Sequence, residues 1–261
     1  MRGQRFPLLA LVAAAALCIA SPVHAERIII SISKHVVQIT SNFDGTQIVL
    51  FGSIERDTPA APLKPSYDIV VTITGPRQTV VTRQKGRVLG IWANVDSRTF
   101  TDVPTYLAVL TTRPVASIVS ADNARRMQIG LENIPLRQQI GAQNVDSPPE
   151  DLFRENFVQI KRDLRLYVEK DKTVTFITPT FFRADIPLPP IAPLGNYDVE
   201  VKLLSEGNLI TRSNSAFELV KSGFEHFVAE SARNHALLYG LATALLAFFT
   251  GWFASILFRR D

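Results

Sequence analysis

The stretch PLGNYDVEVKLLSEGNLITRS, residues 193–213, is the clearest indication of fold class in the chain. From Tyr197 to Leu203 apolar residues alternate with charged ones, the period of a strand with one buried face. Glu206-Gly207-Asn208 then predicts a tight turn into a second strand. The result is an antiparallel hairpin of the kind common in immunoglobulin-like sandwiches.

Strand-like segments recur on both sides of this hairpin. They are RIIISISKHVVQIT (27–40), TQIVLFGSI (46–54), YDIVVTITG (67–75), TVVTRQKGRVLGIWANV (79–95), TYLAVLTTRP (105–114), TVTFIT (173–178) and FFRADIPLP (181–189). Segment 79–95 predicts a hairpin that turns at Lys85-Gly86. Short strands without helical crossovers favour an antiparallel sandwich over a parallel sheet. We expect a sandwich-like domain over 26–114 and a second such unit over 172–221; one composite β-domain remains an alternative.

The middle of the chain, 115–171, predicts a helical insertion. Within SPPEDLFRENFVQIKRDLRLYVEKD (147–171), Ser147 and Glu150 match a capping box and Pro148 suits the first helical position. Spacings of three and four predict one apolar stripe along this helix. Its members are Phe153, Phe157, Ile160, Leu164 and Tyr167.

The chain ends in ALLYGLATALLAFFTGWFASILFRRD, residues 236–261. Ala236 to Phe258 contains no charged side chain, and about 20 helical residues suffice to cross a bilayer. We therefore expect a transmembrane helix over 236–258, a juxtamembrane segment over 222–235 and a cytoplasmic tail over 259–261. Arg259 and Arg260 indicate the cytoplasmic side by the positive-inside tendency.

The N-terminus predicts export. Residues 1–25 combine basic Arg2 and Arg5, an apolar run and a Val23-His24-Ala25 cleavage pattern, which is typical of a signal peptide. With the C-terminal span, this predicts a bacterial inner-membrane protein that crosses the membrane once, with its N-terminal body in the periplasm.

Composition limits the classes of function. Cys18, the only cysteine, lies in the signal, so the exported body has to be stabilised by its hydrophobic core. Loss of Arg2 and Arg5 lowers the formal charge from +4 to +2, because residues 1–25 carry no acid. This near-balance argues against nucleic-acid binding.

The sequence offers no catalytic or metal-ligating pattern. Within the body His35 is the only candidate base, and the histidines lack metal-ligand spacing. We predict neither a cofactor nor an enzyme, and a hydrolase remains a third reading.

Two features suggest interaction surfaces. Trp92, Asn94 and Asp96 form a candidate partner surface, although Trp92 in a sandwich core with a turn at Asp96-Ser97 is the alternative. Ala247, Gly251 and Ser255 recur every fourth residue and predict a helix-packing face in the membrane, for a partner or for homo-oligomerisation.

The chain also resembles, nearly end to end, a family of transmembrane proteins from alphaproteobacteria. The matching segments include VQITSNFDGTQIVLFGSIE, DIVVTITGPR, GIWANVDSRTFTDVPTYLAVLTTRP, IGLENI, GNYDVEV and GWFASILFRR. The resemblance implies an inner-membrane protein with a periplasmic body and no particular activity. An association of the family with sulfite-exporter-type permeases implies an accessory role in transport.

We therefore expect a non-enzymatic membrane protein whose β-rich domain binds a permease or another envelope protein. The alternative is a periplasmic domain that binds or senses a solute or anion, for which Arg83, Lys85 and Arg87 are the candidate residues.

Overall fold

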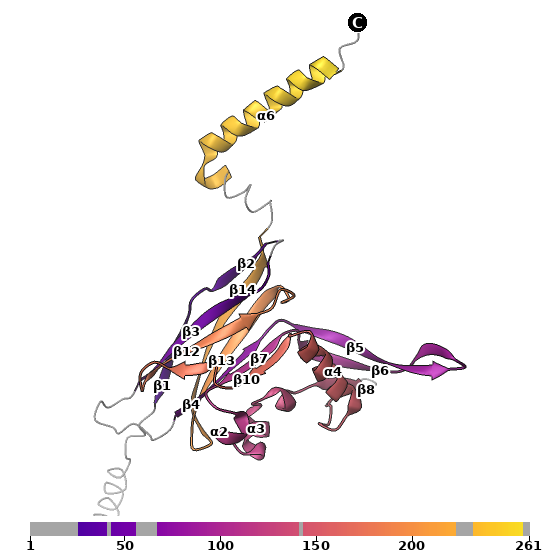
Figure 1. Ribbon diagram of the computed structural model, residues 1–261, viewed down its shortest axis with the longest axis vertical. Coiled ribbons are helices and arrows are strands. Elements are labelled where there is room, and N and C mark those ends of the chain that lie inside the picture. The colour runs from indigo at the N-terminus through magenta and orange to yellow at the C-terminus, as the bar shows by residue number, and fades with distance from the viewer. Residues whose placement is uncertain (1–25, 41–42, 56–66, 141–142, 223–231, 258–261) are drawn as a thin grey trace, which may run out of the picture.

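The computed structural model describes residues 26–40, 43–55, 67–140, 143–222 and 232–257 (Figure 1). The predicted signal peptide, the cytoplasmic tail and residues 223–231 of the juxtamembrane segment lie outside the described residues. The described chain is mostly strands in three sheets, with few helices and one apolar helix near its C-terminal end. The prediction of a mostly β fold with a helical insertion and a C-terminal apolar helix is confirmed.

The first sheet is antiparallel throughout, in the order β1-β3-β12-β11. Its strands are β1 (Arg27–Ile32), β3 (Thr46–Glu55), β11 (Val174–Phe176) and β12 (Phe181–Leu188). Alternate residues of β3 are buried, as the period of two requires for a sheet with one covered face.

The second sheet has six strands in the order β10-β7-β4-β13-β14-β2. They are β2 (Val36–Ile39), β4 (Tyr67–Thr74), β7 (Leu107–Thr111), β10 (Tyr167–Lys170), β13 (Gly195–Ser205) and β14 (Asn208–Lys221). The predicted hairpin is present as β13 and β14. The inner pairs are antiparallel, whereas β2 and β10 join the two edges in parallel pairs.

Strands from both ends of the body share these sheets. β3 pairs with β12 in the first sheet, and β4 pairs with β13 in the second. The two strand sets of 26–114 and 172–221 thus make one composite β-domain. The predicted boundaries at residues 114 and 172 do not separate one sheet from another.

One hydrophobic core joins the two sheets. It contains Ile48 and Leu50 from the first sheet and Val71 and Tyr197 from the second. The hydroxyl of Tyr106, in front of β7, donates to the carbonyl of Pro187 in β12, and burial raises the pKa of this phenol well above its usual value.

The third sheet, in the order β5-β6-β8-β9, extends away from this core. Its strands are β5 (Arg77–Val88), β6 (Ile91–Pro104), β8 (Arg137–Ile140) and β9 (Gln143–Asp146). The helical insertion expected over 115–171 also contains the strands β8, β9 and β10. β8 forms because it completes its backbone hydrogen bonds on β6, far away in the sequence.

The helical part of the insertion surrounds α4, Leu152–Asp163. The other elements are α2 (Val115–Ile118), α3 (Ala121–Met127) and the 3₁₀ helix η1 (Leu131–Asn133). The cap of α4 is Asp151, whose carboxylate accepts from the Phe153 amide at 2.9 Å, so the predicted capping box is wrong. Ser147 contacts the cap residue and not the helix backbone: its hydroxyl donates to the Asp151 carboxylate at 2.9 Å. Tyr167 belongs to β10 and not to the helix.

Arg154, on α4, holds the insertion together from inside. Its side chain is 6% exposed and its guanidinium donates to three backbone carbonyls. The acceptors are Glu132 at 2.9 Å, Ile134 at 2.6 Å and Ser147 at 3.2 Å. Burial lowers the pKa of Arg154, while Asp146 and Asp151 favour its charged form.

Arg154→Ala should lower the free energy of unfolding by about 3 kcal/mol, because three carbonyls would lose a charged donor inside the protein. Urea unfolding of the detergent-solubilised chain measures this difference. Arg162→Ala on the same helix is the control, since Arg162 is exposed, and it should change the value by less than about 0.5 kcal/mol. Equal effects of the two variants would contradict this role of Arg154.

Candidate interaction surface on the β5–β6 arm and helix α6

The hairpin of β5 and β6 projects from the side of the sandwich as a long arm (Figure 1). Val88 pairs with Ile91, so the turn consists of Leu89 and Gly90. Their φ angles of +49° and +86° are those that a two-residue type I′ turn requires. The hairpin was predicted, but its turn is displaced from Lys85-Gly86, which lies inside β5.

Strand register divides the arm into two faces. Paired residues lie on the same face and neighbours along a strand on opposite faces. Arg87 pairs with Trp92 and Lys85 with Asn94, whereas Val88 pairs with Ile91 and Gly86 with Ala93. The first two pairs and Arg83 form what we call the basic face, and the last two pairs belong to the apolar face.

A register shift at Gln84/Lys85 adds Val95 to the apolar face. A Cβ atom at Gly86 would lie 2.8 Å from Val95 Cγ1, so the absence of a side chain at Gly86 makes room for Val95. The same shift pairs Asp96 with Gln84 and separates it from Asn94. Asp96 accepts instead from Arg98 at 3.2 Å.

The predicted partner residues therefore only partly come together. Trp92 is 67% exposed and shares the basic face with Asn94, while Asp96 lies on the other face. The alternative that Trp92 belongs to the sandwich core is wrong, because β6 runs beyond the core at this point. Asp96 and Ser97 are both within the strand and form no turn.

The apolar residues at the tip were not singled out by sequence reasoning. Val88, Ile91 and Val95 are all exposed, and Leu89 is 99% exposed. Segment 79–95 contains two glycines: the sequence pattern predicted a turn at Lys85-Gly86, whereas the structure has it at Leu89-Gly90.

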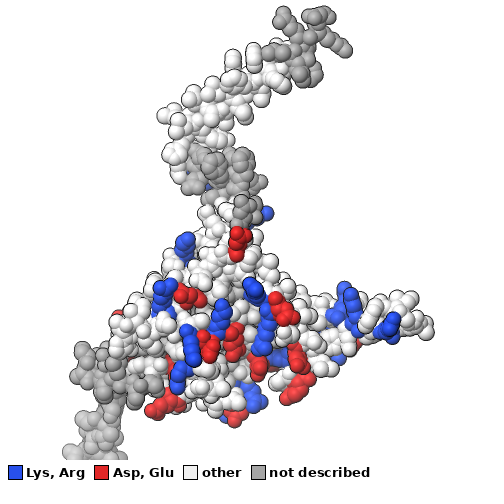
Figure 2. Space-filling model, viewed as in Figure 1, with Lys and Arg blue, Asp and Glu red and all other residues white. Residues whose placement is uncertain are grey.

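Positive charge predominates on the arm beyond Arg98, where Asp96 lies on the apolar face. Between Arg77 and Val95 the sequence contains no acidic residue. Arg83, Lys85 and Arg87 have no carboxylate partner within the described chain. Figure 2 shows this part of the arm as blue and white surface, in contrast to the mixed charges of the body.

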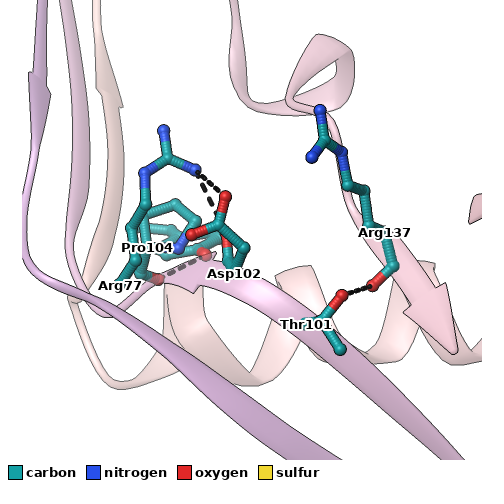
Figure 3. Close-up of polar contacts among 6 residues, drawn as sticks. Arg77, Thr101, Asp102, Pro104 and Arg137 are labelled. Carbon is teal, nitrogen blue, oxygen red and sulfur yellow. Dashed lines mark hydrogen bonds and ion pairs between the residues drawn. The ribbon is translucent and has the colours of Figure 1, made fainter. Parts of the chain in front are cut away.

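The base of the arm is fixed by a contact between its own two strands and by a contact with β8. The Arg77 guanidinium donates to the Asp102 carbonyl at 3.1 Å, and the Thr101 hydroxyl donates to the Arg137 carbonyl of β8 at 3.4 Å (Figure 3). Asp102 has a φ of +57°, at an irregular point near the base of β6. These contacts hold the arm where β8 supports it.

Helix α4 supports the same base from the apolar face. The Phe100 and Phe157 rings are 5.5 Å apart, and the Arg98 guanidinium lies 4.9 Å from the centre of the Phe153 ring. Lys161 lies over the rings of Phe157 and Tyr167, and burial lowers its pKa. The support ends near Arg98, so the outer arm depends on its own pairing.

A cleft of the body carries charges of both signs. It has a volume of about 1060 Å³, and its lining contains Arg162, Arg165 and Lys170 together with Asp44 and Glu169. The Glu169 carboxylate is partly engaged by the Leu131 amide at 2.8 Å. His35 was predicted as the only candidate base of the body. It lies just before β2, at the opposite edge of the six-stranded sheet from this cleft, and its Nδ1 is 3.2 Å from the Ala216 carbonyl.

Helix α6, Ala236–Leu257, occupies the predicted transmembrane segment to within one residue of its end. Its 22 residues give a length of about 33 Å, enough for a hydrocarbon core of about 30 Å. It is the one helix in the described part of the chain that is long and apolar enough to cross a membrane. The hydroxyls of Thr243 and Thr250 donate to carbonyls of the preceding turn at 3.0 and 2.9 Å, so they are satisfied within the helix.

The predicted packing face of α6 is open. Ala247, Gly251 and Ser255 are all exposed, and a Cβ atom at Gly251 would have no described neighbour within 4 Å. A helix-packing role of these residues remains a prediction.

Comparison with known proteins gives a family match over nearly the whole chain. A family described as "Putative transmembrane protein (Alph_Pro_TM)" matches residues 27–260, from β1 to beyond the end of α6. Among curated proteins and solved structures, none matches.

Leu89→Asn should stabilise the arm by about 1 kcal/mol, because a left-handed conformation is costly for leucine and well tolerated by asparagine before glycine. Hydrogen exchange of the β5 and β6 amides measures this local stability. Leu209→Asn in β14 is the control. The backbone at Leu209 has no positive φ, so this change should not slow hydrogen exchange of the β5 and β6 amides. Faster exchange in the Leu89→Asn arm would mean that the leucine stabilises the turn.

Proposed function

The chain belongs to the Alph_Pro_TM family of transmembrane proteins, and on this premise we propose that it is a non-enzymatic accessory protein of the bacterial inner membrane. It crosses the membrane once through α6, with its immunoglobulin-like β-domain in the periplasm and its C-terminus in the cytoplasm. Its partner is a membrane permease or another protein of the envelope, consistent with export of sulfite or an organic acid.

The observation that carries this proposal is the exposure of α6: none of its most apolar window is buried against the described body. A span exposed in this way offers its surface to lipid and to helices of another protein. Within lipid there is no hydrophobic drive between helices, so association depends on close packing across small residues.

The row of Ala247, Gly251 and Ser255 supplies such a surface. At 100° per residue these three residues lie within about 80° of one another around the helix, whereas Phe249 and Phe253 lie on the opposite side. A helix of the partner would approach along the row, with the phenylalanines toward lipid. This docking leaves the β-domain above the periplasmic mouth of the partner.

Orientation is supported by the chain ends. Arg259 and Arg260 follow the span, and residues 1–25 have the pattern of an export signal.

Gly251→Leu should abolish copurification of a membrane partner after crosslinking in native membranes, because the added side chain separates the two backbones. The matched control is Phe253→Leu on the opposite side, which should retain the partner at the wild-type level. Mass spectrometry of the crosslinked material identifies what is recovered. Recovery of self-adducts alone from the wild type would contradict an accessory role and favour homo-oligomerisation.

A further inference from the structure

We propose that the β5–β6 arm binds the surface of an anionic bilayer, with its apolar tip at the acyl-chain boundary and its basic face against headgroup phosphates. This contact is independent of any protein partner of α6. It assigns a ligand to the arm, whose exposed side chains have no role in the sandwich core.

The tip has the composition of a membrane-interface element. Leu89 projects furthest, at 99% exposure, and Ile91 behind it is 71% exposed. Trp92 follows on the basic face, and tryptophan prefers the boundary between headgroups and acyl chains. An apolar tip followed by a tryptophan ring matches the order of acyl chains and then the headgroup boundary that the arm would meet in a bilayer.

The basic face supplies the second half of the contact. Arg83, Lys85 and Arg87 are spaced by two, so all three project from one face of β5. They have no carboxylate partner in the described structure, and no acidic residue lies between Arg77 and Val95 to oppose them. Such a cluster is attracted to anionic headgroups within a Debye length of the surface.

Charge also argues against a second copy of this chain as the occupant. Two arms packed with their basic faces together would place three cations of one copy near three of the other, while the acid of this region, Asp96, lies on the other face and accepts from Arg98. A bilayer, by contrast, is always nearby, because α6 anchors the chain in one.

The turn itself shows that the tip is not optimised for folding. Leu89 adopts a φ of +49°, a conformation that glycine or asparagine adopts at lower cost, and its side chain contributes nothing to the core. Insertion into lipid is a use for an apolar side chain at this position that the fold does not provide.

The test uses the full chain with Trp252→Phe, which leaves Trp92 as the only tryptophan. The protein is reconstituted into vesicles of phosphatidylcholine with phosphatidylglycerol, or of phosphatidylcholine alone, with bromine on the acyl chains. Quenching of Trp92 fluorescence by bromine reports contact of the arm with lipid. We expect strong quenching in the anionic vesicles, little in the neutral ones, and a loss of quenching as salt is raised.

Arg83→Gln, Lys85→Gln and Arg87→Gln together should remove the quenching, because each lost charge lowers the equilibrium constant for lipid contact about fivefold. The matched control carries Arg126→Gln, Arg162→Gln and Arg165→Gln, three exposed cations of the body, and should quench like the parent. The salt titration needs no substitution and so stands even if a variant misfolds.

Three results would overturn the proposal. Absence of quenching in anionic vesicles would exclude lipid contact, and equal quenching in neutral vesicles would exclude the role of the basic face. Protection of Trp92 from acrylamide in native membranes but not in vesicles of pure lipid would assign the arm to a protein partner instead.

Discussion

The structure depends on one constraint: α6 is apolar on every side and the described body covers none of its most apolar window. Water cannot solvate such a helix without a large hydrophobic cost, and a bilayer removes that cost while leaving all backbone hydrogen bonds within the helix. The candidate span and the family both support membrane contact, and this contact decides which other surfaces matter. The arm and the row of small residues are candidate interaction surfaces because both are exposed on a protein that has a candidate membrane span.

The composite β-domain gives these surfaces a rigid support. Because β3 pairs with β12 and β4 with β13, neither of the two sheets that share the core is complete without strands from both ends of the body. Buried charges fix the remaining parts: the Asp68 carboxylate accepts from Arg113 Nε at 2.8 Å, and Lys202 donates to the Met127 carbonyl of α3 at 3.0 Å. Such buried polar groups are costly unless satisfied, so they specify one arrangement of the insertion on the sheets.

The sequence was most informative where one local signal has a single physical reading. The uncharged run from Ala236 and the alternation from Tyr197 to Leu203 correctly predicted α6 and β13. It was least informative where partners are remote or local rules are broken. β8 depends on β6, Asp151 replaced Ser147 as the helix cap, and Leu89 occupies a turn position that its side chain disfavours. Trp92 was predicted on a partner surface with the sandwich core as the alternative, and only the structure decides between them, since nothing local shows that β6 extends beyond the core.

The most direct test of the account is the side of the membrane on which the body lies. Single cysteines are introduced by Ser97→Cys on the arm or Asp261→Cys at the end of the chain, with Cys18, the only native cysteine, replaced by serine. A membrane-impermeant maleimide is then applied to intact spheroplasts. The account predicts labelling of the Ser97→Cys protein before lysis and of the Asp261→Cys protein only after it. The reverse order would place the body in the cytoplasm and contradict the account.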